Sequence, residues 1–403
     1  MKNFIASISK EEVQDFIFSH EMDDVQKLLL KQKTILGVPT DWIAQQLLGR
    51  RKAKTKLDTW YRTRGIIYPP SLNLEQSSSE ATGKFKSNLL KKISVKKEAM
   101  RGADLTGGFG IDTFFLSQQA EHIDYADPNG ELLEIARHNH HQLGVGNITY
   151  HQTSAEAFLH STPNHFDFLY LDPSRRKAQQ KVFRLADSEP DMIALQSEIF
   201  SKAKNVLIKT SPLLDLQQGF KDLQDVAQII VVAVENECKE LLFLLQYDFL
   251  GTPTITAVDL DRTGETINMV SFTFDEESRS LVSFASPLTY LYEPNAAILK
   301  AGAFKWVAQH YHLKKLGVST HLYTSEDQKD FPGRIFKILD FVKPDKKLKD
   351  RFANGYANIL TRNYPMSVEE IKKKTGLKEG GEQYLICTQS EKEKWVMVAE
   401  RIR

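Results

Sequence analysis

Cysteine is scarce in this chain of 403 residues, which has only two, and long apolar runs are missing. Two cysteines without a paired spacing exclude a disulfide framework, and no Cys/His cluster indicates a zinc or iron–sulfur site. The apolar runs at 228–234 and 241–245 are far too short to span a bilayer. The first residues lack the apolar core of a secretory signal. We therefore expect a cytoplasmic protein without a metal.

Net charge is also low, at +1, but it is unevenly distributed. Residues 1–100 carry +7, residues 101–250 carry −9 and residues 251–403 carry +3. An acidic central part alone would repel a polyanion, whereas basic flanks could contact phosphates. Solvated helix faces are the alternative explanation for these flanks. Hydrophobic content of 41% and charged content of 26% indicate a globular protein of two or three domains.

A glycine-rich stretch at 103–112 is the most informative feature of the chain. A short apolar segment ends in Asp104, glycines follow at 107, 108 and 110, and a helical pattern then begins. This order predicts a strand, a tight turn and a helix start, where backbone can approach a ligand closely. Thr113 stands where a dinucleotide fingerprint has its third glycine. The stretch instead resembles motif I of class I S-adenosylmethionine (SAM)-dependent methyltransferases; a βα turn without a ligand is the alternative.

The next two strand ends extend this resemblance. Asp127 precedes a helical pattern at 131–139, where a carboxylate accepts hydrogen bonds from both ribose hydroxyls of the nucleoside or stabilises a helix N-terminus. Ser154 follows a strand near 147–151, where many relatives have an Asp that contacts adenine. Glu156 is a substitute for that contact, or Ser154 only caps the next helix. The residues expected to bind SAM here are Asp104, Thr106, Gly108, Gly110, Asp127, Ser154 and Glu156.

The fourth strand ends in Asp172 and Pro173, at the position of the methyltransferase catalytic loop. In the amine-directed form of this loop, the carboxylate and a proline carbonyl accept hydrogen bonds from the acceptor amine. Ser174 and Arg175 stand where that form has a second proline and an aromatic residue, and this aromatic usually stacks on a flipped base. Arg175 and Arg176 suggest a phosphate contact, with surface ion pairs as the alternative.

The positions of the two cysteines indicate which kind of acceptor atom can be methylated. Cys238 lies just beyond a strand expected at 227–234, and Cys387 is near the C-terminus. Methylation at pyrimidine C5 needs a thiolate, but the loops at 172–174 and 209–212 contain no cysteine. We therefore expect N- or O-methylation without a covalent intermediate, in which the enzyme mainly positions the reactants.

The N-terminal part, 1–95, is expected to be mostly helical. It contains a basic run followed by aromatic residues such as Trp60, a pattern that can track a phosphate backbone and stack on bases. The alternative is a cationic helix face whose aromatics enter the core. The cations expected to bind phosphate are Arg50, Arg51 and Lys52. Glu80 and Thr82 precede the first strand and are candidates for a lid over the methionine end of SAM, with a simple helix cap as the alternative.

Strand and helix patterns alternate over 100–250 and end in strands at 205–209, 228–234 and 240–247. The last two predict a hairpin, so a parallel sheet would finish in one antiparallel strand. Beyond residue 250 a turn signal at 261–264 predicts another hairpin. Further strands are expected near 290–294, 320–324, 333–342, 357–361, 383–388 and 394–400, with helices near 345–351 and 367–374.

Several motifs together are similar to those of one bacterial family, the class I SAM-dependent methyltransferases with a C-terminal THUMP-like domain. Beside motif I, they lie at 172–176, 207–215, 290–294, 322–325 and 331–334. The resemblance covers nearly the whole chain. It implies an α/β fold in which a Rossmann-like, seven-stranded methyltransferase sheet lies between an N-terminal helical region and a C-terminal α+β portion, ferredoxin-like plus THUMP-like. The expected domains are 1–95, 96–272, 273–318 and 319–403.

The same resemblance implies an RNA partner, since THUMP domains generally bind RNA and often tRNA. The residues themselves show only a net charge of +7 over 314–378, which suits an RNA backbone. The expectation is a SAM-dependent methyltransferase acting on tRNA or rRNA. The alternatives are a methyltransferase for a small molecule or protein, and a non-catalytic RNA-binding protein with a relict SAM fold.

Overall fold

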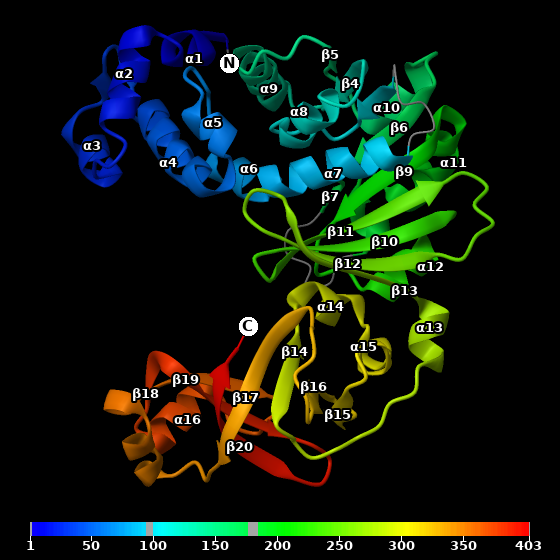
Figure 1. Ribbon diagram of the computed structural model, residues 1–403. Helices are drawn as coiled ribbons and strands as arrows, with labels where there is room; N and C mark the ends of the chain where they lie inside the picture. The colour runs from blue at the N-terminus through cyan, green and yellow to red at the C-terminus, as the bar shows by residue number, and fades with distance from the viewer. Residues whose placement is uncertain (1, 94–99, 176–183, 403) are drawn as a thin grey trace. The chain divides into compact units, whose positions relative to one another are not determined.

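The computed structural model describes residues 2–93, 100–175 and 184–402, which form two compact units (Figure 1). The first unit consists of Met1–Glu235, Lys239–Thr252 and Leu260–Thr266. The second consists of Asn236–Cys238, Pro253–Asp259 and Ile267–Arg403. Each unit buries its own apolar side chains in hydrophobic cores.

The N-terminal part of the first unit is helical, as its periodicity indicates. Ile43 and Leu47 stand four residues apart on one helix face and are fully buried in one core with Trp60. Asp24 starts the third helix by accepting a hydrogen bond from the amide of Gln26. The elements are α1 Lys2–Ile8, α2 Glu11–Ser19, α3 Val25–Lys31, β1 Thr34–Ile35, β2 Val38–Pro39, α4 Thr40–Lys56, α5 Asp58–Arg62, α6 Ser71–Gln76 and α7 Glu80–Ile93.

A mostly parallel sheet follows in the same unit. The strands of this sheet that lie mainly in the first unit are β3 Arg101–Asp104, β4 His122–Ala126, β5 Ile148–His151, β6 Phe166–Leu171, β9 Ala203–Thr210, β10 Val226–Val234 and β11 Glu237–Gln246. They lie in the order β10-β11-β9-β6-β3-β4-β5, with β3 parallel to β4 and β6, and β11 antiparallel to β9. The expected α/β fold is confirmed. The carboxyl ends of β3, β4, β6 and β9 share one edge, where ligands bind in sheets of this kind.

Helices connect the parallel strands, because parallel neighbours need a crossover. They are α8 Ile111–Ser117, α9 Gly130–Gln142, α10 Ala155–Ser161, α11 Met192–Lys202 and α12 Leu216–Asp222, with the short 3₁₀ helix η1 Leu185–Asp187. Two short antiparallel strands, β7 Ser174–Arg175 and β8 Ser188–Glu189, pair just after β6. This pairing fixes the start and the end of the catalytic-loop segment.

The second unit contains a sheet with the order β15-β16-β14-β17-β20-β19-β18. The strands of this unit are β12 Thr254–Leu260, β13 Thr266–Thr273, β14 Tyr290–Pro294, β15 Lys314–Gly317, β16 Thr320–Ser325, β17 Gly333–Phe341, β18 Tyr356–Arg362, β19 Lys378–Gln389 and β20 Lys394–Arg401. Its helices are α13 Phe274–Arg279, α14 Ala296–Ala301, α15 Phe304–His310, η2 Lys346–Arg351, η3 Ala353–Gly355 and α16 Val368–Thr375. β18 and β19 pair in parallel, and α16 makes the crossover.

This second sheet curls, so that its outer strands approach each other. Thr320, at the start of β16, donates a hydrogen bond to the carbonyl of Gln389 at the end of β19. Asn363, just after β18, donates to the Thr320 hydroxyl at 2.8 Å. The sequence patterns predicted β14 and β16 to β20, but not β15 or α15. β15 is only four residues long and its register shifts after Lys315, so it leaves little alternation to recognise.

Candidate functional site

The three glycines of the turn between β3 and α8 are required for different structural reasons. Gly108 and Gly110 have left-handed backbone, with φ of +54° and +83°. A Cβ at Gly107 would lie 2.0 Å from the Tyr125 ring, so only glycine fits there. A Cβ at Gly108 would meet only the Thr106 carbonyl oxygen, at 3.7 Å. The turn therefore presents bare backbone to open space at Gly108.

A buried histidine holds this turn in place. His140 Nε2 lies 2.8 Å from the carbonyl oxygen of Gly110, and Nδ1 lies 2.9 Å from the hydroxyl of Tyr150. Burial lowers the pKa of His140 to about 4, so the ring is neutral. Because a carbonyl only accepts, Nε2 carries the proton and Nδ1 accepts from Tyr150. Sequence reasoning missed His140, which lies 30 residues beyond the glycine that it supports.

Asp104 stands at the carboxyl end of β3 and is only 1% exposed. Its carboxylate accepts hydrogen bonds from the Thr106 amide at 3.1 Å and the Thr113 hydroxyl at 2.6 Å. Burial raises the pKa of Asp104 to about 7. These bonds tie the strand end to the first turn of α8, so Asp104 orders the turn from beneath.

Asp127 stands at the end of the neighbouring strand, β4, as predicted. It accepts hydrogen bonds from the Asn129 amide at 2.7 Å and the Gly108 amide at 2.8 Å. Burial raises the pKa of its carboxyl. The structure thus brings Asp104, Gly108, Gly110 and Asp127 together. Carboxylates at adjacent strand ends beside an open glycine turn supply the hydrogen-bond acceptors that a nucleoside with ribose hydroxyls requires.

Asp172 lies beside this turn, at the carboxyl end of β6. Its amide donates to the Thr106 hydroxyl at 2.6 Å, which links the catalytic loop to the glycine-rich turn. Its carboxylate is one-third exposed and forms an ion pair with the ammonium of Lys209, the penultimate residue of β9. Pro173, next in the chain, is buried.

Sequence reasoning did not assign a role to Lys209. Burial lowers the pKa of this ammonium, but the carboxylates of Asp172, Asp112 and Glu240 outweigh burial and raise it above its usual range. A charged residue at the end of the apolar run 206–208 was the signal that could have found it, because the ends of β6 and β9 meet at one edge.

A second buried lysine lies under the same edge. Lys86 of α7 has a 1% exposed side chain and pairs with both oxygens of Glu240, on β11, at 2.8 Å. It also lies 3.2 Å from Asp112, in the first turn of α8, and 3.1 Å from the Ser78 hydroxyl. Asp112 in turn accepts a hydrogen bond from the Tyr170 hydroxyl at 2.7 Å. These side chains join α7, α8, β6 and β11 in one network.

Three predicted SAM ligands, Ser154, Glu80 and Thr82, have other partners in the structure. Ser154 caps α10 by accepting from the Ala157 amide at 3.3 Å, and Glu156 is exposed in that helix. The buried Glu80 carboxylate accepts from the Thr59 amide and, at 2.9 Å, from its hydroxyl. Thr82 is 2% exposed and bonds to Ser79 in the first turn of α7. The bonds of Ser154 and Thr82 match the helix-cap alternative, whereas Glu80 accepts from Thr59 in the first turn of α5.

The predicted phosphate-binding cations are also engaged. Arg50 is 7% exposed, pairs with Glu21 at 2.9 Å and stacks on Phe18 and Tyr61, so burial removes it from a phosphate. Arg51 bonds to the carbonyl oxygens of Glu21 and Asp23. Lys52 donates hydrogen bonds to the Ser71 hydroxyl and the Glu75 carboxylate. Helical periodicity did not reveal that Arg50 faces inward. The side chain of Arg175 and all of Arg176 lie outside the described residues.

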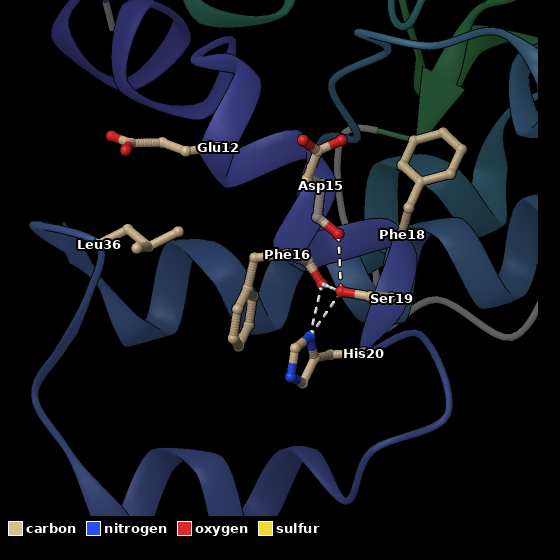
Figure 2. Close-up of a pocket in the computed structure, with 7 residues that line it drawn as sticks. All are labelled: Glu12, Asp15, Phe16, Phe18, Ser19, His20 and Leu36. Carbon is tan, nitrogen blue, oxygen red and sulfur yellow. Dashed lines mark hydrogen bonds between the residues drawn. The ribbon is translucent and has the colours of Figure 1, made fainter.

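A hollow of about 750 Å³ lies elsewhere, in the N-terminal helices (Figure 2). Figure 2 shows that Phe16 and His20 line it face to face, with ring centroids 3.9 Å apart. Its lining comes from Glu12, Asp15, Phe16, Phe18, Ser19, His20 and Leu36. None of these residues belongs to the glycine-rich turn, and a wide surface hollow without convergent polar groups is a weak indication of a ligand site.

Two searches over the described part of the chain were negative. Its helices include none that is long and apolar enough to cross a bilayer. Among its His, Cys, Asp and Glu side chains, no group of three or more is placed to hold a metal ion.

Comparison with known proteins gives two kinds of match. Residues 290–332 match a family described as a ferredoxin-like domain, and residues 333–401 match one described as THUMP domain-like. A "putative methyltransferase" from Porphyromonas gingivalis W83 is 30% identical in sequence, and its crystal structure matches with a TM-score of 0.85 over 100% of this chain and 99% of that one.

Other solved structures match at lower similarity. An rRNA methylase from Streptococcus thermophilus is 14% identical, with a TM-score of 0.30 over 40% of this chain and 93% of that one. A SAM-dependent methyltransferase from Agrobacterium tumefaciens is also 14% identical, with a TM-score of 0.34 over 52% of this chain and 64% of that one. No curated protein matches the sequence.

Proposed function

Because this chain belongs to the class I SAM-dependent methyltransferases with a C-terminal THUMP-like domain, we propose that it transfers a methyl group from SAM to an RNA. The observation that carries this proposal is the pair of carboxylates, Asp104 and Asp127, at adjacent strand ends around the open turn at Gly108. When bound, SAM supplies an electrophilic methyl group.

Each residue of the turn has a part in holding SAM. Asp127 binds the ribose hydroxyls, because each of its two oxygens accepts one amide, from Gly108 or Asn129, and keeps a further lone pair for a hydroxyl. The backbone at Gly108 and Gly110 contacts the ligand where no side chain intervenes. Asp104 keeps this backbone in place through Thr106 and attracts the cationic methionine end of SAM.

The RNA part of the proposal depends on the C-terminal unit. Its residues 333–401 match the THUMP domain-like family, and the segment 314–378 carries a net charge of +7. Such a basic α+β module can neutralise phosphates, and its affinity for RNA then falls as salt rises. The acidic catalytic unit, with −9 over 101–250, needs such a module to hold a polyanion.

Two measurements test the proposal. Nucleosides from the total RNA of cells with and without the gene are compared by mass spectrometry, and one methylated nucleoside should be missing without the gene. Calorimetry on the purified protein should show SAM binding that Asp127→Ala weakens at least tenfold, because a charged hydrogen-bond acceptor is lost.

A matched variant controls for the loss of a carboxylate at a helix start. Asp215 caps α12 by accepting from the Gln218 amide at 2.8 Å, and it is not part of the glycine-rich turn. Asp215→Ala should leave SAM affinity unchanged. If SAM binds normally but RNA nucleosides are identical in both strains, the acceptor is not RNA. If SAM does not bind, the methyltransferase proposal itself fails.

A further inference from the structure

Four charged side chains alternate in sign where the catalytic loop meets the SAM turn. Asp172 and Lys209 form one ion pair, at the ends of β6 and β9. Lys86 and Glu240 form the other, between α7 and β11. The pairs are coupled, because the Glu240 carboxylate contributes to the raised pKa of Lys209. The amine-directed form of the catalytic loop, to which Asp172 and Pro173 were compared, does not account for either lysine.

We propose that the acceptor is a hydroxyl, the ribose 2′-hydroxyl of an RNA, and that Asp172 and Lys209 contact it while Lys86 and Glu240 position them. This inference rests on the proposed RNA methyltransferase function and names its acceptor. It also gives Lys209 a catalytic role that the catalytic-loop motif did not predict.

Exposure separates the two pairs into a contacting and a supporting layer. The side chains of Asp172 and Lys209 are 33% and 11% exposed, whereas those of Lys86 and Glu240 are 1% and 3% exposed. Only the first pair can reach a substrate. The side chains of the second pair are almost fully enclosed, so they can act on the acceptor only through the first pair.

The ammonium at Asp172 favours a hydroxyl over an exocyclic amine. An amine acceptor needs hydrogen-bond acceptors that take its N–H groups and leave its lone pair free. An ammonium only donates, so Lys209 would compete for Asp172 and could hold the amine only through that lone pair. A hydroxyl oxygen has two lone pairs and one proton, so it donates to Asp172, accepts from Lys209 and still has one lone pair for the methyl group.

The described start of the catalytic loop, residues 172–175, contains no aromatic side chain on which a flipped base could stack. Ser174 follows Asp172 and Pro173, is exposed and has no ring on which a base could stack. A ribose hydroxyl can be reached without extruding a base. An acceptor on the sugar therefore does not require an aromatic ring at this position.

The transfer balances as follows. The hydroxyl oxygen forms a bond to the methyl carbon, the carbon–sulfur bond breaks with its electron pair going to sulfur, and the hydroxyl proton passes to the Asp172 carboxylate and then to water. The products are a 2′-O-methyl ether, S-adenosylhomocysteine and one proton. The ammonium of Lys209 stabilises the negative charge that develops on the oxygen as its proton leaves.

The decisive experiment uses RNA from cells that lack the gene as the substrate for the purified full-length protein and SAM. The RNA is digested to nucleosides, and the product is identified by mass spectrometry. We expect a nucleoside methylated on its ribose, together with a phosphodiester that resists alkaline cleavage because no free 2′-hydroxyl remains to attack it. A base-methylated product overturns the hydroxyl proposal but keeps the RNA methyltransferase function. An unmethylated RNA contradicts both.

Variants then test the two contacting residues. Lys209→Met and Asp172→Asn should each lower the rate of product formation at least about 100-fold, as expected for a group that moves or stabilises a proton. Their SAM affinities, measured by calorimetry, should stay within threefold of wild type. Lys221→Met, at an exposed position of α12, is the matched control and should keep full activity. Undiminished rates with Lys209→Met overturn the role of Lys209.

The supporting pair is tested by a readout that a purely structural role would not move. Glu240→Gln removes one of the carboxylates that raise the pKa of Lys209. Glu240→Gln should therefore lower kcat more than it changes the KM for SAM, because the charge around Lys209 changes and the glycine-rich turn does not. Lys86→Arg should restore most of the activity that Lys86→Met loses. An unchanged kcat in folded Glu240→Gln contradicts the positioning role.

Discussion

Both units bury a glutamate, but they neutralise it in different ways. Glu240 in the first unit is paired with Lys86, and both side chains are at most 3% exposed. Glu293 in the second unit is 4% exposed and lies between Arg334 and Arg362, which are 24% and 45% exposed. The carboxylates are alike, so the difference lies in the cations and in their access to water.

The choice of cation follows from what each network must do. A lysine ammonium is a compact point charge, and Lys86 shares itself among Glu240, Asp112 and Ser78. An arginine presents a planar fork that fixes direction, and Arg334 and Arg362 each hold one oxygen of Glu293. The lysine network lies at the proposed catalytic edge, whereas the arginine network ties β17 and β18 to β14.

The largest expected effect is on the lysine network. Lys86→Met leaves Glu240 and Asp112 buried without their cation, which should lower the free energy of unfolding by about 3–5 kcal/mol. Urea unfolding of the full chain measures this. Lys91→Met, at an exposed position of the same helix, is the control and should change stability by less than about 0.5 kcal/mol. Equal losses for both variants would show that the buried pair is not special.

Asp104 extends the comparison of buried carboxylates, because its hydrogen-bond donors are an amide and a hydroxyl rather than a cation. The pKa of Asp104 is about 7 when folded, against about 3.9 when unfolded. The folded protein therefore binds this proton more tightly, and stability falls as pH rises from 4 to 7. Asp104→Asn does not titrate, so its stability relative to wild type should rise by about 3 kcal/mol between pH 5 and pH 8. Urea unfolding at both values checks this; a constant difference would contradict it.

The sequence was sufficient to place residues whose position depends on local order. Asp104, Gly108, Gly110 and Asp127 were predicted to lie together because strand, turn and helix follow one another within a few residues, and the structure brings them together. Lys86 and Glu240 stand 154 residues apart, and only the strand order of the sheet brings them together. Local patterns contain no information on such pairs.

The burial of Arg50 could not be predicted from the sequence for a related reason. A run of cations predicts a charged helix, but it does not tell which of them faces inward. Arg50 is buried because Glu21, 29 residues earlier, supplies its partner. The same reasoning applies to Ser154, for which a cap and an adenine contact look identical in sequence; in the structure its hydroxyl oxygen accepts from the Ala157 amide, as a cap does.

An intermediate effect is expected at the arginine network. Glu293→Gln removes the charge between Arg334 and Arg362, but both guanidinium groups can turn toward water. The free energy of unfolding should fall by about 1–3 kcal/mol, less than for Lys86→Met. Thermal unfolding measures the loss, with Glu382→Gln at an exposed position of β19 as the control. A larger loss than for Lys86→Met would reverse the comparison.

The smallest effect separates the two arginines. Arg362 is nearly half exposed, so solvent screens its pair with Glu293, and Arg362→Met should cost less than about 1 kcal/mol. Arg334 is less exposed and gives two nitrogens to one carboxylate oxygen, so Arg334→Met should cost more. Urea unfolding of the two variants gives the order directly. If Arg362→Met is the costlier change, closure of the curled sheet depends on the exposed guanidinium, and water access does not set the strength of these pairs.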